Sequence, residues 1–322
     1  MKNIFKLLLI GTTCLIFAIQ FSIAQDDKKE EKKQNDTERV QILPDEDFEL
    51  SIPSITFSMK SNNNVTEWKK NFERPFIGLS IGNSLFKSEE YKPINFDKVS
   101  VAQITLGYYE KAEHTKSIIT KTSINEIFIT NTSDIFKKLD ANSQNVRGEF
   151  WRFGQNSGKG YGYKFSDYLS LNFLYKDGLS WTLSKFEPNQ YFEAGKTDTF
   201  NFNTYNESIR FGEQFESIAS IEVLKYLSFN ASYERINVYP RHMFWAWLGG
   251  KIIEEGAQGL LGTFIKEIRK YSPEFTPVIS LLLRTGLSYG LYELRRNNMN
   301  WPFDTAPPFT FENIKFGLQF NF

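Results

Sequence analysis

The chain ends in IKFGLQFNF (residues 314–322), in which every even position is apolar and every odd position is polar or glycine. Successive side chains of a β-strand point to opposite faces, so this period predicts a strand with one dry and one wet face. The dry face carries Phe316, Leu318, Phe320 and the terminal Phe322. The end of the chain is therefore expected to separate an apolar environment from an aqueous one.

This closing strand resembles that of bacterial outer-membrane β-barrel proteins, whose terminal aromatic residue is part of the signal read by the barrel-insertion machinery. The resemblance implies that Phe316, Leu318, Phe320 and Phe322 form a barrel-insertion signal. It also implies outer-membrane lipid and that machinery as partners. A soluble secreted β-sandwich that ends in the same pattern is the alternative.

The first 24 residues read as a cleavable secretory signal peptide. Lys2 and Lys6 precede an apolar run over 7–21, and Ser22-Ile23-Ala24 places small residues before Gln25. The alternative is an uncleaved anchor helix. The single cysteine, Cys14, lies inside this segment, so the mature chain has no cysteine for a disulfide, a thiol nucleophile or a metal.

A charged segment follows the signal peptide. Residues 26–47 contain nine acidic and five basic residues and few apolar side chains, which cannot offset the entropy of ordering the chain. We expect residues 25–74 to be a disordered, acidic periplasmic leader, with a short strand or plug segment over 55–59, and residues 75–322 to form the barrel.

Composition supports a barrel over other membrane architectures. The 322 residues are 16% aromatic, yet the mean hydropathy is −0.39, which is too polar for a helical membrane protein. The 38 basic and 38 acidic residues balance, whereas a nucleic-acid-binding chain usually has a basic excess. The Phe/Tyr-rich, Asn/Lys-rich style resembles envelope proteins of Gram-negative Bacteroidota.

Alternating segments upstream predict an all-β transmembrane barrel of about ten antiparallel strands. A three-residue loop at 176–178 would pair Tyr175 with Leu179 and keep the dry faces together. An eight-strand barrel, with 169–186 continuous and 279–293 helical, is the alternative, and it keeps the short turns on the periplasmic side. The ten expected strands lie near 76–86, 98–109, 117–131, 149–165, 169–175, 179–186, 207–223, 227–239, 279–293 and 309–322.

One inserted amphipathic helix is predicted over 243–271, where apolar residues recur every three or four positions. Its apolar stripe contains Ile253, Leu260, Phe264 and Ile268, and Lys251 lies opposite. We expect this stripe to pack on protein. The helix would cap the barrel mouth, fill the lumen, or dock an envelope protein partner. Lying along the membrane surface is a further alternative. Replacing Leu260 or Phe264 with Glu should then loosen the helix, and replacing Lys251 with Glu should not.

Chemical motifs are nearly absent from the sequence. His114 and His242 read as exposed turn residues, and neither has the His-x-Ser arrangement of outer-membrane lipid A deacylases. No catalytic, cofactor-binding or metal site is predicted. We therefore expect a non-enzymatic barrel, structural or an accessory subunit of an envelope complex. A narrow pore or a conduit for lipids or other hydrophobes is the alternative, and a lipid-modifying enzyme is the least favoured.

Overall fold

The computed structural model describes residues 48–52, 55–59, 68–87, 99–115, 117–133, 147–187 and 202–322. The expected signal peptide lies outside these residues, as does most of the leader. Within the leader, β1 (Phe48–Ile52) and β2 (Ile55–Met59) pair as an antiparallel hairpin. The expected strand over 55–59 is therefore present.

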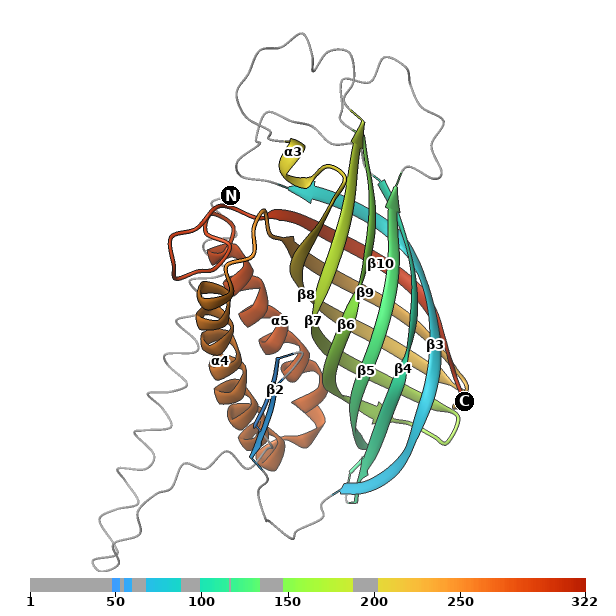
Figure 1. The fold of residues 1–322 in the computed structure, drawn as a ribbon. Coiled ribbons are helices and arrows are strands. Elements are labelled where there is room, and N and C mark those ends of the chain that lie inside the picture. The colour runs from blue at the N-terminus through green and yellow to red at the C-terminus, as the bar shows by residue number, and fades with distance from the viewer. Residues whose placement is uncertain are drawn as a thin grey trace, which may run out of the picture. The chain divides into compact units, whose positions relative to one another are not determined.

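Eight antiparallel strands close into a barrel in the order β10-β3-β4-β5-β6-β7-β8-β9 (Figure 1). Every neighbour in the ring is also a neighbour in sequence except β10 and β3, which close it. The first of these strands begins at Trp68, seven residues before the expected barrel boundary. The strands are β3 (Trp68–Lys87), β4 (Val99–His114), β5 (Ile119–Ser133), β6 (Arg147–Lys164), β7 (Leu169–Glu187), β8 (Ser208–Val223), β9 (Leu227–Val238) and β10 (Phe309–Asn321).

The expectation of ten strands is wrong, and the eight-strand alternative is the one observed. The first of the two differences is that β7 runs without a turn through Asp177 and Gly178. Asp177 pairs with Ser157 on β6 and with Phe215 on β8, so both ladders continue across the expected loop. No described glycine has a positive φ, which the expected three-residue turn would require at Gly178.

The second difference is that the segment expected as a strand over 279–293 is a helix, α5 (Thr276–Leu294). Its small or polar residues Thr276, Ser280, Arg284 and Ser288 recur every four positions and are all buried. A spacing of four residues suits one face of a helix, but it also falls on alternate positions of a strand. The apparent alternation was therefore a helical face read with the wrong period.

The short turns all lie at the barrel end that also holds the start of β3 and the end of β10. They follow β4, β6 and β8, and the last two turns occupy residues 165–168 and 224–226. Leu224 and Lys225 have positive φ, as a tight hairpin turn with the strand twist requires. The opposite end holds the end of β3, the start of β10 and the short helix α3 (Phe202–Tyr205). We call these the turn end and the loop end.

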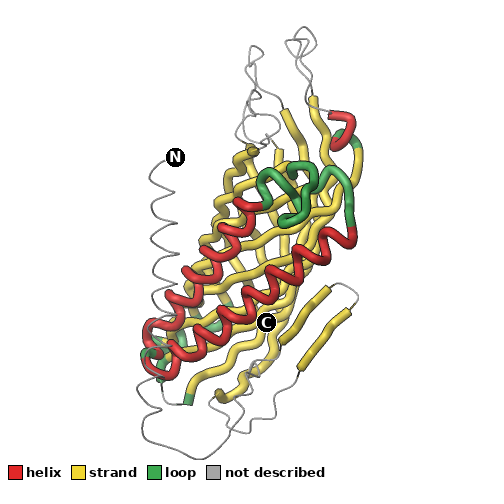
Figure 2. Tube along the Cα trace, turned by 90° about the vertical axis from the view of Figure 1, so that its left-hand side faces the viewer, coloured by secondary structure: helices red, strands yellow, loops and turns green. Residues whose placement is uncertain are grey.

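The longest connection, between β9 and β10, forms a helical hairpin. The helix α4 (Phe244–Tyr271) runs from the loop end to the turn end, η2 (Pro273–Phe275) turns the chain, and α5 runs back (Figures 1 and 2). Both helices lie alongside the barrel wall, where α5 contacts β6, β7 and β8. The hairpin therefore neither caps the mouth nor fills the lumen, in contrast to two of our expectations. Among the described helices, none is both long enough and apolar enough to cross a membrane.

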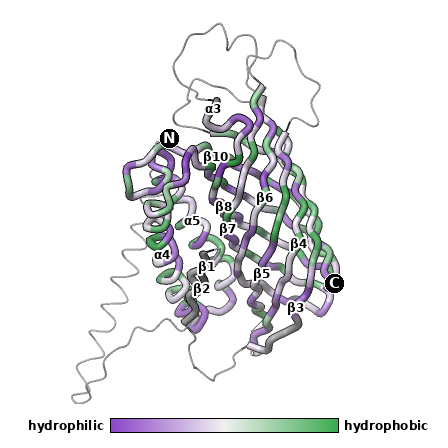
Figure 3. Tube along the Cα trace, in the orientation of Figure 1, coloured by the Kyte–Doolittle hydropathy of each residue, from purple (hydrophilic) through white to green (hydrophobic). Residues whose placement is uncertain are grey.

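Hydrophobic and hydrophilic residues alternate along many of the strands (Figure 3). The exposed outward positions are mostly apolar, and the buried inward positions are largely polar. On β3, for example, Ile77, Leu79 and Ile81 point outward and are exposed, whereas Ser84 points inward and is buried. An aromatic cluster, the lumen plug, fills the lumen near the loop end. Its buried members are Phe150, Phe186, Tyr205, Ile236, Val238, Phe309 and Phe311.

Candidate functional site

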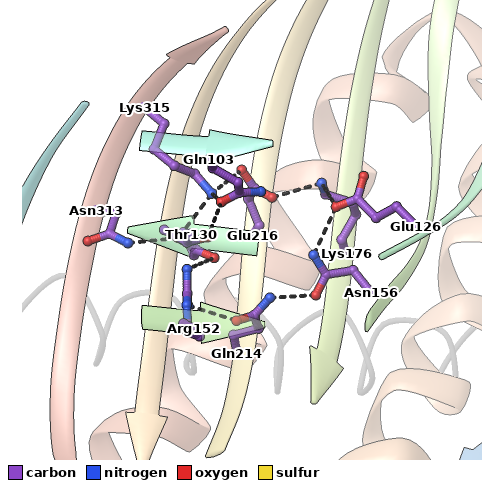
Figure 4. Close-up of polar contacts among 11 residues, drawn as sticks. Gln103, Glu126, Thr130, Arg152, Asn156, Lys176, Gln214, Glu216, Asn313 and Lys315 are labelled. Carbon is purple, nitrogen blue, oxygen red and sulfur yellow. Dashed lines mark hydrogen bonds and ion pairs between the residues drawn. The ribbon is translucent and has the colours of Figure 1, made fainter. Parts of the chain in front are cut away.

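Two polar clusters stand out in the barrel and its hairpin, and the first is an ion-pair network that crosses the middle of the lumen (Figure 4). Lys176 Nζ lies 2.6 Å from Glu126 and 2.8 Å from Glu216. Lys315 Nζ lies 3.0 Å from both Glu216 and Glu234. The network continues across the lumen through amide side chains and one further cation: Arg152, Gln103, Asn156, Gln214 and Asn313.

Strand pairing places several of these groups side by side. Glu216 is opposite Lys176 on one side and Glu234 on the other, and Lys315 on the neighbouring strand β10 contacts both Glu216 and Glu234. Three acids and three bases balance, and each is almost completely buried. An eight-stranded barrel has an interior just wide enough for side chains to fill. Together with the lumen plug, this network closes the lumen.

The second cluster lies outside the lumen, between the outer barrel wall and the helical hairpin; we call it the seam. Its centre is Glu213 on β8, whose carboxylate accepts hydrogen bonds from Arg295 at 2.9 Å, Trp247 at 2.5 Å and Tyr239 at 2.5 Å. Arg295 also lies 3.0 Å from Glu254 of α4. Since Glu213, Glu254 and Arg295 are all buried, this triad ties both helices to the wall.

Further ion pairs extend the seam along the wall. Lys251 of α4 lies 3.2 Å from Asp177 on β7 and 3.0 Å from Glu255. Arg235 on β9 lies 2.7 Å from Glu293 of α5. On strands whose outward positions are otherwise mostly apolar, Asp177, Glu213 and Arg235 point outward and are covered by the hairpin. They form a polar strip on the outside of the barrel.

Further hydrogen bonds continue the seam toward the turn end. Tyr175 on β7 and Ser288 on α5 share a 2.6 Å hydrogen bond, and Gln258 of α4 donates to the same Ser288 oxygen at 2.9 Å. Lower still, Arg269 donates to the Tyr161 hydroxyl at 3.2 Å. Tyr175 and Tyr161 of the wall thus bond the hairpin, and Gln258 links its two helices, so the seam spans the length of the hairpin.

The seam reverses our expectation for the predicted helix. Ile253 and Leu260 of the apolar stripe are 42% and 74% exposed and point away from the wall, while Phe264 and Ile268 are partly covered. The face that packs on protein contains Glu254 and Gln258, which the stripe hypothesis placed opposite. The packing expectation was wrong for the exposed stripe residues because a polar wall selects a polar helix face. Partner docking by the stripe stays a prediction.

The other predicted residues lie apart from both clusters. Phe316, Leu318, Phe320 and Phe322 are exposed on the outward face at and beyond β10, as the alternation predicts. Their role as an insertion signal stays a prediction.

Neither histidine lies near a reactive constellation. His114 is at the turn end, 3.0 Å from Ser117 Oγ and against the Trp68 ring. His242 is exposed and stacks edge-on against Phe211. Desolvation lowers the pKa of His242 from its ordinary value. Within the described residues, no group of three or more histidine, cysteine, aspartate or glutamate side chains is arranged to hold a metal ion.

The fold is similar to those of small barrels among the solved structures. Neisserial surface protein A aligns with a TM-score of 0.38 and 8% identity, over 77% of this chain and 97% of that one. Ail, the attachment invasion locus protein of Yersinia pestis, aligns at 0.32 and 10% identity, over 77% and 98%. Ail in complex with the heparin analogue sucrose octasulfate aligns at 0.31 and 10%, over 78% and 99%. These likenesses are too distant to carry a functional argument. No protein-family model and no curated protein matches the sequence.

Proposed function

We propose that this chain is a non-enzymatic β-barrel of the bacterial outer membrane that serves as a structural or accessory subunit of an envelope complex. The observation that carries the proposal is a closed barrel that is apolar outside and blocked inside. The signal peptide over 1–24 and the closing strand that ends at Phe322 supply the route to the membrane.

The outward face supports a membrane location. Exposed Ile, Leu and Phe residues ring the strands that the hairpin leaves uncovered, for example Ile104 on β4, Ile127 on β5 and Phe316 on β10. Monomeric soluble proteins rarely expose apolar patches of this extent, because exposed apolar surface costs free energy in water. A barrel with no free edge strand is one of only two architectures that satisfy every backbone hydrogen bond inside lipid.

The closed lumen favours a subunit over a channel. A permeating solute would have to displace both the ion pairs around Lys315 and the lumen plug. Removing one partner from a buried ion pair costs about 3–5 kcal/mol. The runner-up function, a narrow pore or a conduit for lipids or other hydrophobes, would require the lumen to rearrange. A lipid-modifying enzyme is least favoured, because the described side chains of His114 and His242 contact aromatic rings and turn residues.

Planar-bilayer recording separates the two leading functions. The refolded barrel is inserted, and insertion is verified by heat-modifiable mobility and protease protection, so that silence reports a closed barrel. We expect no stable conductance at any applied voltage. Reproducible open levels would favour the pore. Turnover of phospholipid or lipid A that is lost in His114→Ala or His242→Ala would instead favour the enzyme.

A further inference from the structure

The hairpin buries polar residues and exposes apolar ones, which is the opposite of a helix pair on the surface of a water-soluble protein. Its buried face contains Glu254, Gln258, Ser280 and Ser288, and these residues face the barrel wall or the other helix. Its outward face carries large apolar residues and glycines. Between Trp245 and Glu267 the exposed residues of α4 are Ile252, Ile253, Leu260 and the uncharged Thr263, and those of α5 are Val278, Leu282, Gly286 and Leu294.

The outward face is apolar over a length that matches a bilayer. On α4, none of the charged residues between Trp245 and Glu267 is in the exposed class. At about 1.5 Å per residue this stretch spans about 33 Å, close to the roughly 30 Å of a hydrocarbon core. On α5 the 19 residues span about 28 Å, and none of the charged ones is in the exposed class.

The two ends of the hairpin carry residues suited to the membrane surface. Phe244 and Trp245 are exposed at the loop end, and Tyr271 and Phe275 at the turn end. The exposed pair Lys270–Glu267 also lies at the turn end. Aromatic rings gather at membrane–water interfaces, and charged groups stay in water.

The outward face of the hairpin also lies level with the apolar belt of the barrel. Ser288 bonds both Gln258 and Tyr175, and the residue after Tyr175, Lys176, pairs with Glu126. Ile127 follows Glu126 on β5, the strand next to β6, and is 60% exposed. Leu260, two residues after Gln258, is therefore at about the height of Ile127.

We propose that the α4–α5 hairpin is embedded in the membrane beside the barrel, with lipid acyl chains against its outward face. The barrel wall shields the polar side of each helix, which could not face lipid, and the hairpin shields the polar strip of Asp177, Glu213 and Arg235. Each partner covers what the other cannot expose to hydrocarbon. Neither helix is apolar enough on all sides to cross a membrane alone. With its polar side against the barrel wall, each helix crosses the bilayer once, so the connection between β9 and β10 crosses it twice.

This inference rests on the proposed membrane location, and nitroxide accessibility tests the two separately. In a Cys14→Ser background, single cysteines are placed at Leu260, Leu282 and Gly286 on the hairpin, and at the exposed Ile127 on β5. Gly286 is the safest site, because nothing lies within 4 Å of an added Cβ. A fifth cysteine at Lys270 marks the aqueous end. Spin labels in lipid vesicles are then exposed to oxygen, which enters the bilayer, and to a water-soluble nickel chelate.

We expect labels at 260, 282 and 286 to match the label at 127, with oxygen collisions at least several-fold favoured over nickel collisions. The label at 270 should show the reverse. Nickel-accessible hairpin labels with a lipid-exposed label at 127 would overturn the inference and leave the membrane barrel intact. Hairpin labels shielded from both reagents would also overturn it, since protein would then cover the face. A nickel-accessible label at 127 would overturn the proposed membrane location itself.

Discussion

The Arg295 guanidinium lies 2.9 Å from the Glu213 carboxylate and joins the end of α5 to the outer wall of β8 across 82 residues of sequence. The same guanidinium nitrogen lies 3.0 Å from Glu254. One cation therefore forms ion pairs with one acid on the wall and one on α4. This contact links three elements of the fold and anchors the loop end of the hairpin.

Replacing Arg295 with Met should release the hairpin. Glu213 loses its only ion-pair partner in the described structure, and the expected cost is about 3–5 kcal/mol. We expect faster protease cleavage between β9 and β10 and a lower urea midpoint in lipid vesicles. The matched control is Arg296→Met, which removes an exposed pair with Glu293 that is worth about 0–1 kcal/mol. Equal protease resistance in both variants would show that the triad does not hold the hairpin.

Replacing Lys251 with Glu should also disturb the hairpin, in contrast to the expectation from sequence. Lys251 lies within 3.5 Å of Asp177, Glu254 and Glu255, so the variant gathers four acids in a mostly buried site. We expect a loss of about 3 kcal/mol or more. Lys270→Glu, at the exposed end of the same helix, is the control. The free energy of unfolding measured in urea should fall in the first variant only.

Replacing Lys315 with Met should weaken the barrel from inside. Its ammonium group lies between Glu216 and Glu234. Without it, Glu216 would keep its ion pair with Lys176, and Glu234 its ion pair with Arg152. A destabilisation of about 3–5 kcal/mol is expected. It should appear as a lower temperature for the loss of heat-modifiable gel mobility, whereas Lys225→Met in the exposed turn should leave that temperature unchanged. An unaltered transition in Lys315→Met would mean that the lumen network contributes little.

Deleting Phe322 should impair insertion in cells more than folding energy. The side chain is 65% exposed on the outward face, so its loss should change the unfolding free energy by about 0.5 kcal/mol or less. We expect much less assembled barrel in cells but normal refolding in detergent. Ile314→Ala removes apolar surface from the same outward face away from the terminus and is the control. Normal assembly of the deletion variant in cells would argue against an insertion signal at Phe322.

The sequence predicted the barrel wall better than the hairpin, for a physical reason. A strand with one face in lipid and one in the lumen alternates strictly, as residues 314–322 do, and β10 was placed almost to the residue. On α5 the buried Ser280, Arg284 and Ser288 fall on alternate positions as well as on one helical face, so local period could not decide.

A signal for the seam was present in the sequence but was not used. Asp177 and Glu213 occupy outward positions in strands whose outward neighbours, such as Leu179 and Phe211, are apolar. A charge in an outward position predicts that something polar must cover it. The covering helices could then have been assigned by their polar faces. What no local pattern could provide was the pairing of Glu213 with Arg295, which depends on the tertiary fold.

Recovery of the native assembly from outer membranes tests the proposed subunit role most directly. The chain, tagged after Gln25, is solubilised in mild detergent and purified alongside an untagged strain, and the native mass and the amino terminus are measured. The account predicts a mature chain that begins at Gln25, in the outer-membrane fraction, in a complex with a stoichiometric protein partner. A lone chain of native mass no greater than its own would contradict the subunit role. Recovery from the soluble periplasm would contradict the membrane barrel.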